Sequence, residues 1–435
     1  MYQGIKTVSF EEAVKVVKSG DRIHIHSVAC APQGLIQALC KRGRAGELKN
    51  VRIQHLHTEG SAPYAEAEFE GIFFLESYFV GSNVRKPTQE GYADYVPVHL
   101  SETQKLIRSG IHPVDVAMIQ VCPPDKHGFV SMGTSVDATL AAVQNAKTVI
   151  GVINPNVPRA WGDAIIKLSD IDIFCEDNTP LIEAHPATLT EQDIAIGKNV
   201  ASLIEDGATL QMGIGAIPNA VLSQLGNHKN LGIHTEMFAD GVLPLYEKGV
   251  VNNMNKKFDK GKIVSTFLMG SKRVYDFIDD NPGVAMMDVG YTNDPFIIAQ
   301  QPKMTAINSA LSVDITGQVN ADSLGIKFYS GSGGQLDFIR GAAASEGGKP
   351  IIALPAVTNK GVSKICPTLL NGAGVVTTRF DVHYIVTEFG IADLYGKTLQ
   401  ERAKTLINIA HPDHRETLDK AAFERFGSHY HFISK

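Results

Sequence analysis

One glutamate in this sequence combines the residue type and the position that nucleophilic chemistry requires. Glu236 follows the short run Gly232-Ile233-His234-Thr235, which we expect to be a buried strand, and it precedes small and turn-forming residues. A carboxylate at a strand end attacks an acyl group when water is excluded and hydrogen-bond donors face the developing oxyanion. A surface glutamate or a helix-capping glutamate is the plainer alternative, and this residue alone does not decide between them.

A glycine turn lies upstream of Glu236, between a predicted strand and a predicted helix. Its sequence is Gly213-Ile214-Gly215-Ala216-Ile217, a pattern typical of turns that bind phosphate at a helix start. It lacks the third glycine and the acidic residue of a dinucleotide fingerprint, and it lacks the Gly-Lys-Ser/Thr ending of a P-loop. A tight turn without a ligand is the alternative.

A second glycine-rich loop lies well downstream, at residues 330–335. Gly331, Gly333 and Gly334 leave backbone N–H groups with few side chains in the way, which suits an oxyanion hole or the close approach of a ligand. The alternative is a flexible surface loop. We expect a helix to begin just after it, at Leu336.

Other polar residues compete for a role in the site. His234 would share the strand face of Glu236, although a structural histidine is the simpler interpretation. Glu388 is a rival carboxylate at a predicted strand end, or a structural one. Lys360 and Lys364 are candidates for phosphate contacts, or solvated lysines. The sequence contains no His/Cys/Asp spacing typical of a metal site and no Gly-x-Ser-x-Gly elbow, so we expect no metal and no serine hydrolase.

Alternating strands and helices should position these loops. The predicted strands and helices of the first half are strands 22–26, 50–56, 114–121 and 148–154 and helices 11–18, 32–39 and 137–145. This alternation predicts a mostly parallel sheet with both faces covered. We expect residues 57–110, which are less periodic, to be loops over the carboxyl ends of the strands.

The second half repeats the pattern of the first. Residues 205–212, 218–225 and 230–235 match residues 18–25, 32–39 and 50–55, respectively. This repeat predicts an α/β fold of two similar open-sheet domains, 1–185 and 186–435, although any two α/β units share some pattern. The first copy has Leu56 where the second has Glu236, so we expect the chemistry in the second copy.

Bulk composition excludes several classes of function. The 435 residues are 44% hydrophobic and 20% charged, with a net charge of −6 and interspersed signs, which argues against a nucleic-acid groove or binding to an anionic membrane. No apolar run reaches the ~20 residues of a membrane span, and no signal peptide is recognisable. Five scattered cysteines indicate a reducing, cytoplasmic location.

Taken together, the motifs resemble those of the acetyl-CoA hydrolase/transferase family of CoA-transferases along nearly the whole chain. The matching segments are 123–129, 201–207, 213–218, 232–237, 331–338, 387–392 and 410–412. The resemblance implies two domains of the same α/β fold and coenzyme A as a substrate. It implies that Glu236 is the catalytic glutamate and that residues 213–217 form the CoA-binding turn. It further implies CoA contacts at Leu311, Gly331, Gly334 and Lys360.

The implied reaction is a ping-pong transfer of CoA. The donor would be a short-chain acyl-CoA, 4-hydroxybutyryl-CoA or butyryl-CoA, the acceptor would be a carboxylate such as acetate, and a glutamyl-CoA thioester would form on the enzyme. Ala239 stands where many relatives carry serine, which leaves the nucleophile intact. Two alternatives remain open: an acyl-CoA hydrolase that uses the same site, and a non-catalytic CoA-binding protein. We also expect a homo-oligomer.

Overall fold

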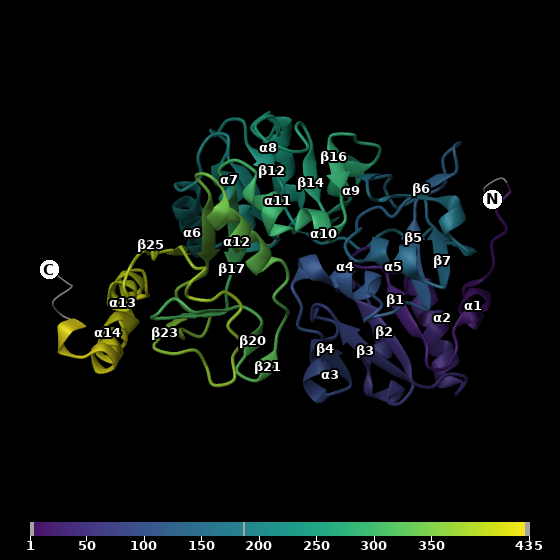
Figure 1. The fold of residues 1–435 in the computed structure, drawn as a ribbon, viewed down its shortest axis with the longest axis horizontal. Helices are drawn as coiled ribbons and strands as arrows, with labels where there is room; N and C mark the ends of the chain where they lie inside the picture. Colours follow the sequence, from purple (N-terminus) through teal and green to yellow (C-terminus); the bar gives the residue numbers. More distant parts are fainter. Residues whose placement is uncertain (1–3, 186–187, 431–435) are drawn as a thin grey trace. The chain divides into compact units, whose positions relative to one another are not determined.

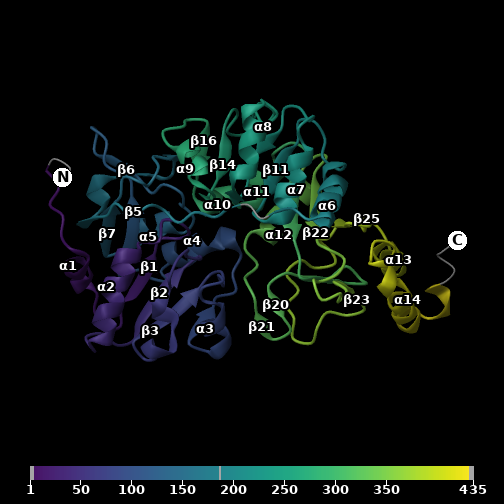
Figure 2. The same ribbon diagram turned by 180° about the vertical axis from the view of Figure 1, so that it is seen from behind.

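The computed structural model describes residues 4–185 and 188–430, which form two compact units. Unit 1 comprises the chain up to His185 together with residues 262–293 and 328–333. Unit 2 comprises residues 188–261, 294–327 and 334–430. Each unit is built around one open sheet (Figure 1, and from behind Figure 2). The predicted division into domains 1–185 and 186–435 stays a prediction. The two compact units are not continuous in sequence, because residues 262–293 and 328–333 belong to unit 1.

The sheet of unit 1 has seven parallel strands. Their order is β10-β7-β5-β1-β2-β3-β4, with β1 Arg22–Ile25, β2 Val51–His55, β3 Phe73–Ser77, β4 Ala93–Tyr95, β5 Val116–Val121, β7 Thr148–Ile153 and β10 Ile173–Glu176. Every residue of β5 is buried, as expected for a central strand covered on both faces. The predicted strands of the first half are therefore confirmed.

Helices and short strands surround this sheet. The helices of unit 1 are α1 Phe10–Ala13, α2 Gln33–Arg44, α3 Arg85–Glu90, α4 Leu100–Arg108, α5 Thr139–Asn145, α9 Lys272–Ile278 and α10 Val289–Thr292, with 3₁₀ turns at Val14–Val16, Pro63–Ala65, Ala67–Phe69 and Leu168–Asp170. Its short strands are β6 Phe129–Ser131, β8 Trp161–Gly162, β9 Ile165–Lys167, β14 Ile263–Ser265, β15 Phe267–Leu268 and β16 Val284–Met286. Ser9 caps α1, with its Oγ accepting a hydrogen bond from the N–H of Glu12 at 3.2 Å.

The prediction that residues 57–110 form only loops is wrong. This segment contains β3, β4, α3 and α4, and its two strands extend the sheet beyond β2. The reason is aromatic burial: Phe69, Phe73 and Tyr95 pack into the core of unit 1. Large aromatic side chains suit a pleated, half-buried surface without giving the clear alternation that we used to recognise strands.

The sheet of unit 2 has five parallel strands and one antiparallel edge strand. Its order is β12-β11-β17-β22-β24-β25, with β11 Thr209–Met212, β12 Gly232–Ile233, β17 Thr305–Ser309, β22 Lys349–Ala353, β24 Tyr384–Thr387 and β25 Gly390–Asp393. Its helices are α6 Glu191–Ala201, α7 Ala216–Gln224, α8 Leu243–Glu247, α11 Pro295–Ala299, α12 Gln335–Ala344, α13 Leu399–Asn408 and α14 Pro412–Phe426, with a 3₁₀ turn at Asp240–Val242. The remaining short strands are β13 Met237–Phe238, β18 Ser312–Asp314, β19 Val319–Asn320, β20 Ser323–Leu324, β21 Lys327–Phe328 and β23 Ile365–Cys366.

The two sheets share one strand order, which confirms the predicted repeat. In unit 1 five consecutive strands run β2-β1-β5-β7-β10, and in unit 2 the corresponding strands run β12-β11-β17-β22-β24. In both units the chain leaves the first strand of the repeat, forms a helix, and returns to the strand that lies beside it. The fold is therefore α/β with two similar open-sheet units.

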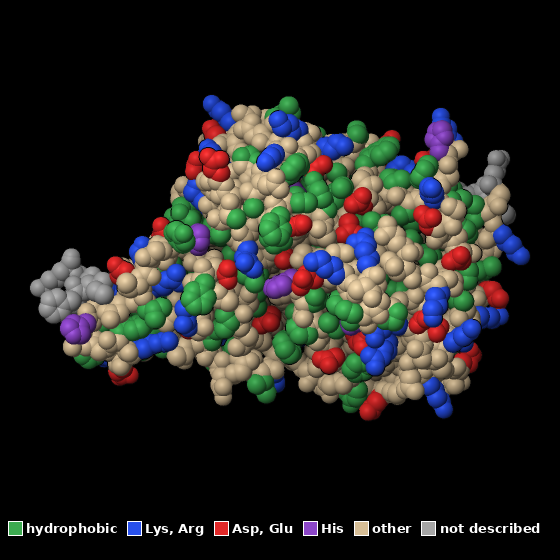
Figure 3. Space-filling view, viewed as in Figure 1, with side chains coloured by type: hydrophobic (Ala, Val, Ile, Leu, Met, Phe, Trp, Pro, Cys, Tyr) green, Lys and Arg blue, Asp and Glu red, His purple; other side chains and the backbone are tan. Residues whose placement is uncertain are grey.

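The surface and the helices show two further properties. On the face drawn in Figure 3, Lys and Arg side chains are interspersed with Asp and Glu. Within residues 4–185 and 188–430, no helix is long and apolar enough to cross a membrane.

Buried neutral histidines should make the protein sensitive to acid. His24, His26 and His55 lie in unit 1 with no exposed surface. Burial lowers the pKa of His24 to about 4 and that of His55 to about 3, and it also lowers the pKa of His26. His26 donates from Nε2 to the carbonyl of Ser135 and accepts at Nδ1 from the N–H of Gln120, so its neutral form is fully bonded.

We expect the free energy of unfolding to fall as the pH falls below about 6.5. The unfolded histidines bind protons from that pH downward, whereas the folded ones resist protonation, so the stability they contribute is complete above pH 6.5 and is lost toward pH 4. The loss is at most about 1.4 kcal/mol per pH unit for each histidine. Urea unfolding at pH 7.5, 6.0 and 5.0 measures it. Equal stabilities at the three pH values would contradict this prediction. The control is His127→Gln, at an exposed position, which should show the same pH dependence as the wild type.

Candidate active site

The candidate site residues of unit 2 gather at the carboxyl ends of its parallel strands. β11 lies between β12 and β17, and all three strands run in the same direction. Gly213 follows β11, Glu236 follows β12 after two residues, and Leu311 follows β17 after one residue. Parallel strands end at one edge of their sheet, so the structure brings Gly213, Glu236 and Leu311 to the same edge, where open α/β sheets bind ligands.

The side chain of Thr235 fixes the segment that carries Glu236. Its buried Oγ1 donates to the carbonyl of Met212 at 2.8 Å and lies 2.9 Å from the carbonyl of Met237, and it accepts from the N–H of Met212 at 3.2 Å. This residue therefore ties the end of β11 to the chain on both sides of Glu236. The Glu236 side chain is half-buried, so it combines a fixed backbone with access from outside.

The glycine turn after β11 has the geometry expected of a ligand-binding turn. Gly215 has φ +114° and ψ −177° and forms the N-cap of α7, a conformation that residues with a side chain rarely adopt. Gly213 has no such requirement, and a Cβ built on it meets nothing within 4 Å. Ile214 is exposed, and the first N–H groups of α7, from Ala216 and Ile217, lie at a helix start, where such groups suit an anionic ligand.

The second glycine loop lies partly in each unit. Gly334 is the N-cap of α12, and the next residue, Gln335, donates from Nε2 to the carbonyl of Ser309 at 2.8 Å. This bond fixes the start of α12 at the end of β17. The helix predicted after the loop is confirmed, because α12 comprises Gln335–Ala344. Gly331 belongs to unit 1, where a Cβ would lie 3.1 to 3.3 Å from Phe79 and Tyr95. Close packing around Gly331 argues against a loose surface loop.

Two more predicted contact residues lie on loops of unit 2. The backbone N–H of Leu311 donates to the carbonyl of Asn320 at 2.8 Å, and its side chain is half-buried. Lys360 is exposed in a turn after β22, where its N–H donates to the Oγ1 of Thr358 at 3.3 Å. The exposed position leaves its ammonium accessible to a phosphate.

The rival carboxylate, Glu388, has a structural role. It follows β24, and its Oε1 accepts from the side chain of Gln192 at 2.6 Å while its Oε2 accepts from the N–H of Ala356 at 2.9 Å. Both oxygens are thus used to join α6 and the loop after β22 to the end of β24. In the sheet β24 is four strand positions from β12, or about 19 Å, so Glu388 does not share a reaction centre with Glu236.

The cysteines do not offer a competing nucleophile. Cys30, Cys40, Cys122 and Cys175 are buried, and Cys366 is half-buried. Burial raises the pKa of Cys30 to about 11 and those of Cys40, Cys175 and Cys366 to about 12, and it also raises the pKa of Cys122. At neutral pH these side chains are protonated thiols, which are weak nucleophiles. No group of three or more His, Cys, Asp or Glu able to hold a metal occurs among the residues described.

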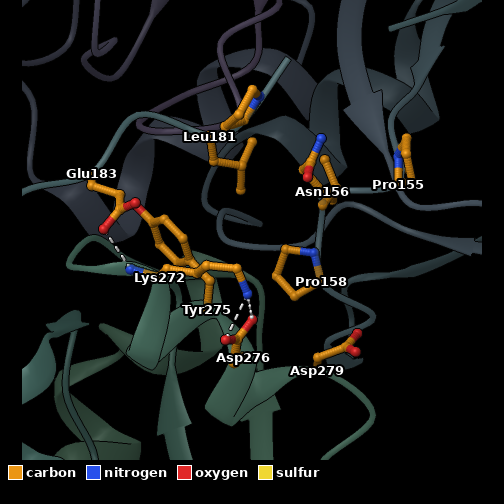
Figure 4. Close-up of a pocket in the computed structure, with 11 residues that line it drawn as sticks. Pro155, Asn156, Pro158, Leu181, Glu183, Lys272, Tyr275, Asp276 and Asp279 are labelled. Carbon is orange, nitrogen blue, oxygen red and sulfur yellow. Dashed lines mark hydrogen bonds and ion pairs between the residues drawn. The ribbon is translucent and has the colours of Figure 1, made fainter. Parts of the chain in front are cut away.

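Two cavities lie away from the predicted residues. One, of about 150 Å³, belongs to unit 1 and is lined by Leu181, Glu183, Tyr275 and other residues drawn in Figure 4. Three of its charged residues are joined: the backbone N–H of Lys272 donates to Glu183, and the Lys272 ammonium contacts Asp276. The other, of about 710 Å³, lies beside the amino-terminal ends of β17 and β22. Among the described residues that line these two cavities, none is a predicted site residue.

The structure also shows polar residues at the site edge that we did not predict. Besides Thr235 and Gln335, Gln211 accepts a hydrogen bond at Oε1 from the Nδ2 of Asn308 at 2.9 Å, across the adjacent strands β11 and β17. A signal was present in the sequence, because each amide directly follows an apolar residue of its strand, Leu210 before Gln211 and Ile307 before Asn308. Gln211 is buried and Asn308 is half-buried. Amides at the carboxyl end of a parallel sheet mark its polar, ligand-facing edge.

Fold and site together define a class: an α/β protein of two repeated open sheets, with a carboxylate and a glycine turn at the same sheet edge. The particular family follows from comparison with known proteins. Sequence profiles of the acetyl-CoA hydrolase/transferase family match residues 2–183 with the N-terminal domain and residues 270–422 with the C-terminal domain. The chain belongs to this family.

Similar proteins cover almost the whole chain. A succinyl-CoA:acetate/propanoyl-CoA:succinate CoA transferase of Fasciola hepatica is 51% identical over 95% of this chain and 87% of its own. A 4-hydroxybutyrate coenzyme A transferase of Clostridium kluyveri is 47% identical over 97% of this chain and 98% of its own. The crystal structure of a 4-hydroxybutyrate CoA-transferase from Porphyromonas gingivalis superposes with a TM-score of 0.83 at 36% identity, covering 97% and 98% of the two chains. An acetyl-CoA hydrolase of Kluyveromyces lactis is more distant, with 25% identity over 95% of this chain and 88% of its own.

Proposed function

We propose that this enzyme is a CoA-transferase that moves CoA from a short-chain acyl-CoA to a carboxylate such as acetate, through a thioester on Glu236. The observation that carries the proposal is the placement of Glu236 beside the Gly213 turn, at the carboxyl edge of one sheet. Relatives named as CoA-transferases, at 51% and 47% identity, support the reaction class. Their names make 4-hydroxybutyryl-CoA and succinyl-CoA the first donors to test, with butyryl-CoA beside them.

The proposed mechanism exchanges one acyl bond for another. The Glu236 carboxylate attacks the carbonyl carbon of the acyl-CoA, the C–S bond breaks, and an acyl-glutamyl anhydride and a CoA thiolate result. The thiolate attacks the glutamyl carbonyl and displaces the first carboxylate, which leaves a glutamyl-CoA thioester. The incoming carboxylate then reverses these steps. Because each step replaces one activated acyl group with another, the enzyme supplies positioning and charge stabilisation rather than driving force.

The remaining predicted residues have defined parts in this proposal. The turn of residues 213–217 would hold CoA through backbone N–H groups at the start of α7, with Leu311 beside it. Backbone N–H groups of residues 331–334 would stabilise the oxyanion, and the ammonium of Lys360 would meet a phosphate. Binding energy from the nucleotide part of CoA would lower the barrier at the distant thioester.

The alternative is hydrolysis, in which water rather than a carboxylate reacts with the activated acyl group, so that a free carboxylic acid and free CoA result. The transferase is favoured because relatives named acetyl-CoA hydrolase lie at lower identity than those named CoA-transferases. A transferase requires a carboxylate acceptor, whereas a hydrolase releases free CoA without one. A homo-oligomer and a cytoplasmic location stay predictions from the sequence.

Trapping the intermediate tests the proposal. The enzyme is mixed with butyryl-CoA, or with 4-hydroxybutyryl-CoA, and is then treated with borohydride or hydroxylamine. A thioester on Glu236 gives a mass change confined to the peptide that contains this residue, since these reagents cleave an activated acyl group. Incubation without acyl-CoA is the control. An unmodified Glu236 peptide during turnover, with free CoA released in the absence of acetate, would overturn the proposal in favour of a hydrolase.

A further inference from the structure

A buried lysine lies against the strand that leads to Glu236. β12 is the edge strand of the unit 2 sheet, and it contains only Gly232 and Ile233. Within the sheet it pairs with β11 alone: the N–H of Gly232 donates to Ala208 and that of His234 donates to Leu210. Alternation along a strand therefore turns the N–H and the C=O of Ile233 away from β11, toward the open edge. A strand of two residues that is hydrogen-bonded to one neighbouring strand only is held less firmly than a longer strand paired on both sides.

Side chains of a following loop occupy this open edge. The N–H of Ile233 donates to the Oδ1 of Asn253 at 2.8 Å, and its carbonyl accepts from the Nζ of Lys256 at 3.0 Å. Two residues earlier the edge is covered by backbone, because the N–H of Leu231 donates to Val250 and its carbonyl accepts from the N–H of Asn253. The two side chains thus take the place of a missing strand at the last residue of β12.

Both Asn253 and Lys256 are buried, and their surroundings hold them in this position. Asn253 is buried with φ +60°, a left-handed conformation that asparagine adopts more readily than most residues. Lys256 has no exposed surface, and its stem lies over Gly232, where an added Cβ would be only 2.8 Å from the lysine Cγ. Burial lowers the pKa of Lys256 to about 7, against the opposing effect of Asp259. A buried ammonium is unfavourable for folding, so an apolar residue would be expected here if packing were the only requirement.

We infer that Lys256 is a positioning residue for Glu236, because its Nζ donates to the carbonyl of Ile233 and so fixes the end of the edge strand three residues before the nucleophile. The inference rests on the proposed role of Glu236. Attack on a thioester tolerates little displacement, and a shift of about 1 Å lowers a rate by about 100-fold. Loss of the lysine donor should therefore slow the chemical step more than it weakens the binding of acyl-CoA, which the Gly213 turn would provide.

Lys256→Met tests the inference, since methionine keeps most of the stem over Gly232 and removes the donor. We expect kcat with butyryl-CoA and acetate to fall at least about 10-fold while KM for butyryl-CoA changes less than about 3-fold. Hydrogen exchange of the peptide that spans residues 231–238 should become faster. Lys257→Met is the matched control, because this neighbouring lysine is exposed and contacts the side chain of Gln300; kcat and exchange should not change.

The outcomes separate the inference from the proposed function. If Lys256→Met retains the wild-type kcat while Glu236→Gln is inactive, the inference is wrong and the proposed nucleophile stands. If Glu236→Gln retains turnover, both are overturned. Should Lys256→Met fail to fold, Lys256→Gln keeps an N–H donor on a shorter stem, and it should give an intermediate kcat at unchanged KM. Faster hydrogen exchange of residues 231–238 at an unchanged kcat in that variant would overturn the inference, because the strand end would then be loosened without effect on the chemical step.

Discussion

Glu236→Gln is expected to lower the rate of CoA transfer by about 10⁴-fold or more, while CoA binding stays within a few-fold of the wild type. The amide is close to the carboxylate in shape but is a poor nucleophile, so the anhydride and the thioester cannot form. The segment around this residue should keep its structure, because Thr235 holds it through hydrogen bonds to Met212 and Met237. Steady-state transfer from butyryl-CoA to acetate and calorimetric titration with CoA measure the two quantities.

The matched control is the same substitution at the other strand-end carboxylate. Glu388→Gln should keep kcat within a few-fold and instead lower the free energy of unfolding by about 1–3 kcal/mol, because one of its two hydrogen bonds, to Gln192 or to Ala356, is weakened. Turnover of Glu236→Gln within 10-fold of the wild type would exclude this residue as the nucleophile. Loss of transfer in Glu388→Gln at unchanged stability would transfer the role to Glu388.

These two glutamates show how far sequence reasoning extends. Glu236 and Gly213 could be brought together before the structure, because both follow strands of one parallel unit and parallel strands end at one edge. The structural role of Glu388 could not be predicted, since Gln192 and Ala356 lie 196 and 32 positions away in the sequence. Long-range hydrogen bonds of this kind leave no local pattern.

The fold shows the same division between local and distant information. The repeated strand order was predictable from short matches, because strands and helices have periodic patterns of their own. Residues 57–110 were not, since Phe73 and Tyr95 are strand residues whose burial depends on a core formed by distant elements. Lys256 is a further case: beside Lys257 it looks like a solvated charge in the sequence, and only the structure shows that its stem occupies the space over Gly232.

Gly213→Val is expected to lower kcat/KM for acyl-CoA about 100-fold without loss of stability. The reason is that nothing in the described structure fills the space beyond this residue: its backbone conformation admits a side chain, and an added Cβ has no neighbour within 4 Å. A valine here would therefore meet the ligand rather than the protein. The free energy of unfolding should stay within about 0.5 kcal/mol of the wild type, as for other substitutions into open space.

Gly226→Val provides the comparison that isolates the ligand. Gly226 follows the other end of α7, is exposed, and shares with Gly213 an ordinary φ and an unfilled Cβ position. The Gly226→Val variant should retain both stability and kcat/KM, because Gly226 lies at the opposite end of α7 from the proposed CoA site. Equal kcat/KM values for the two variants would show that the Gly213 turn does not contact CoA. A loss of stability in Gly213→Val alone would instead show that this glycine is required by packing.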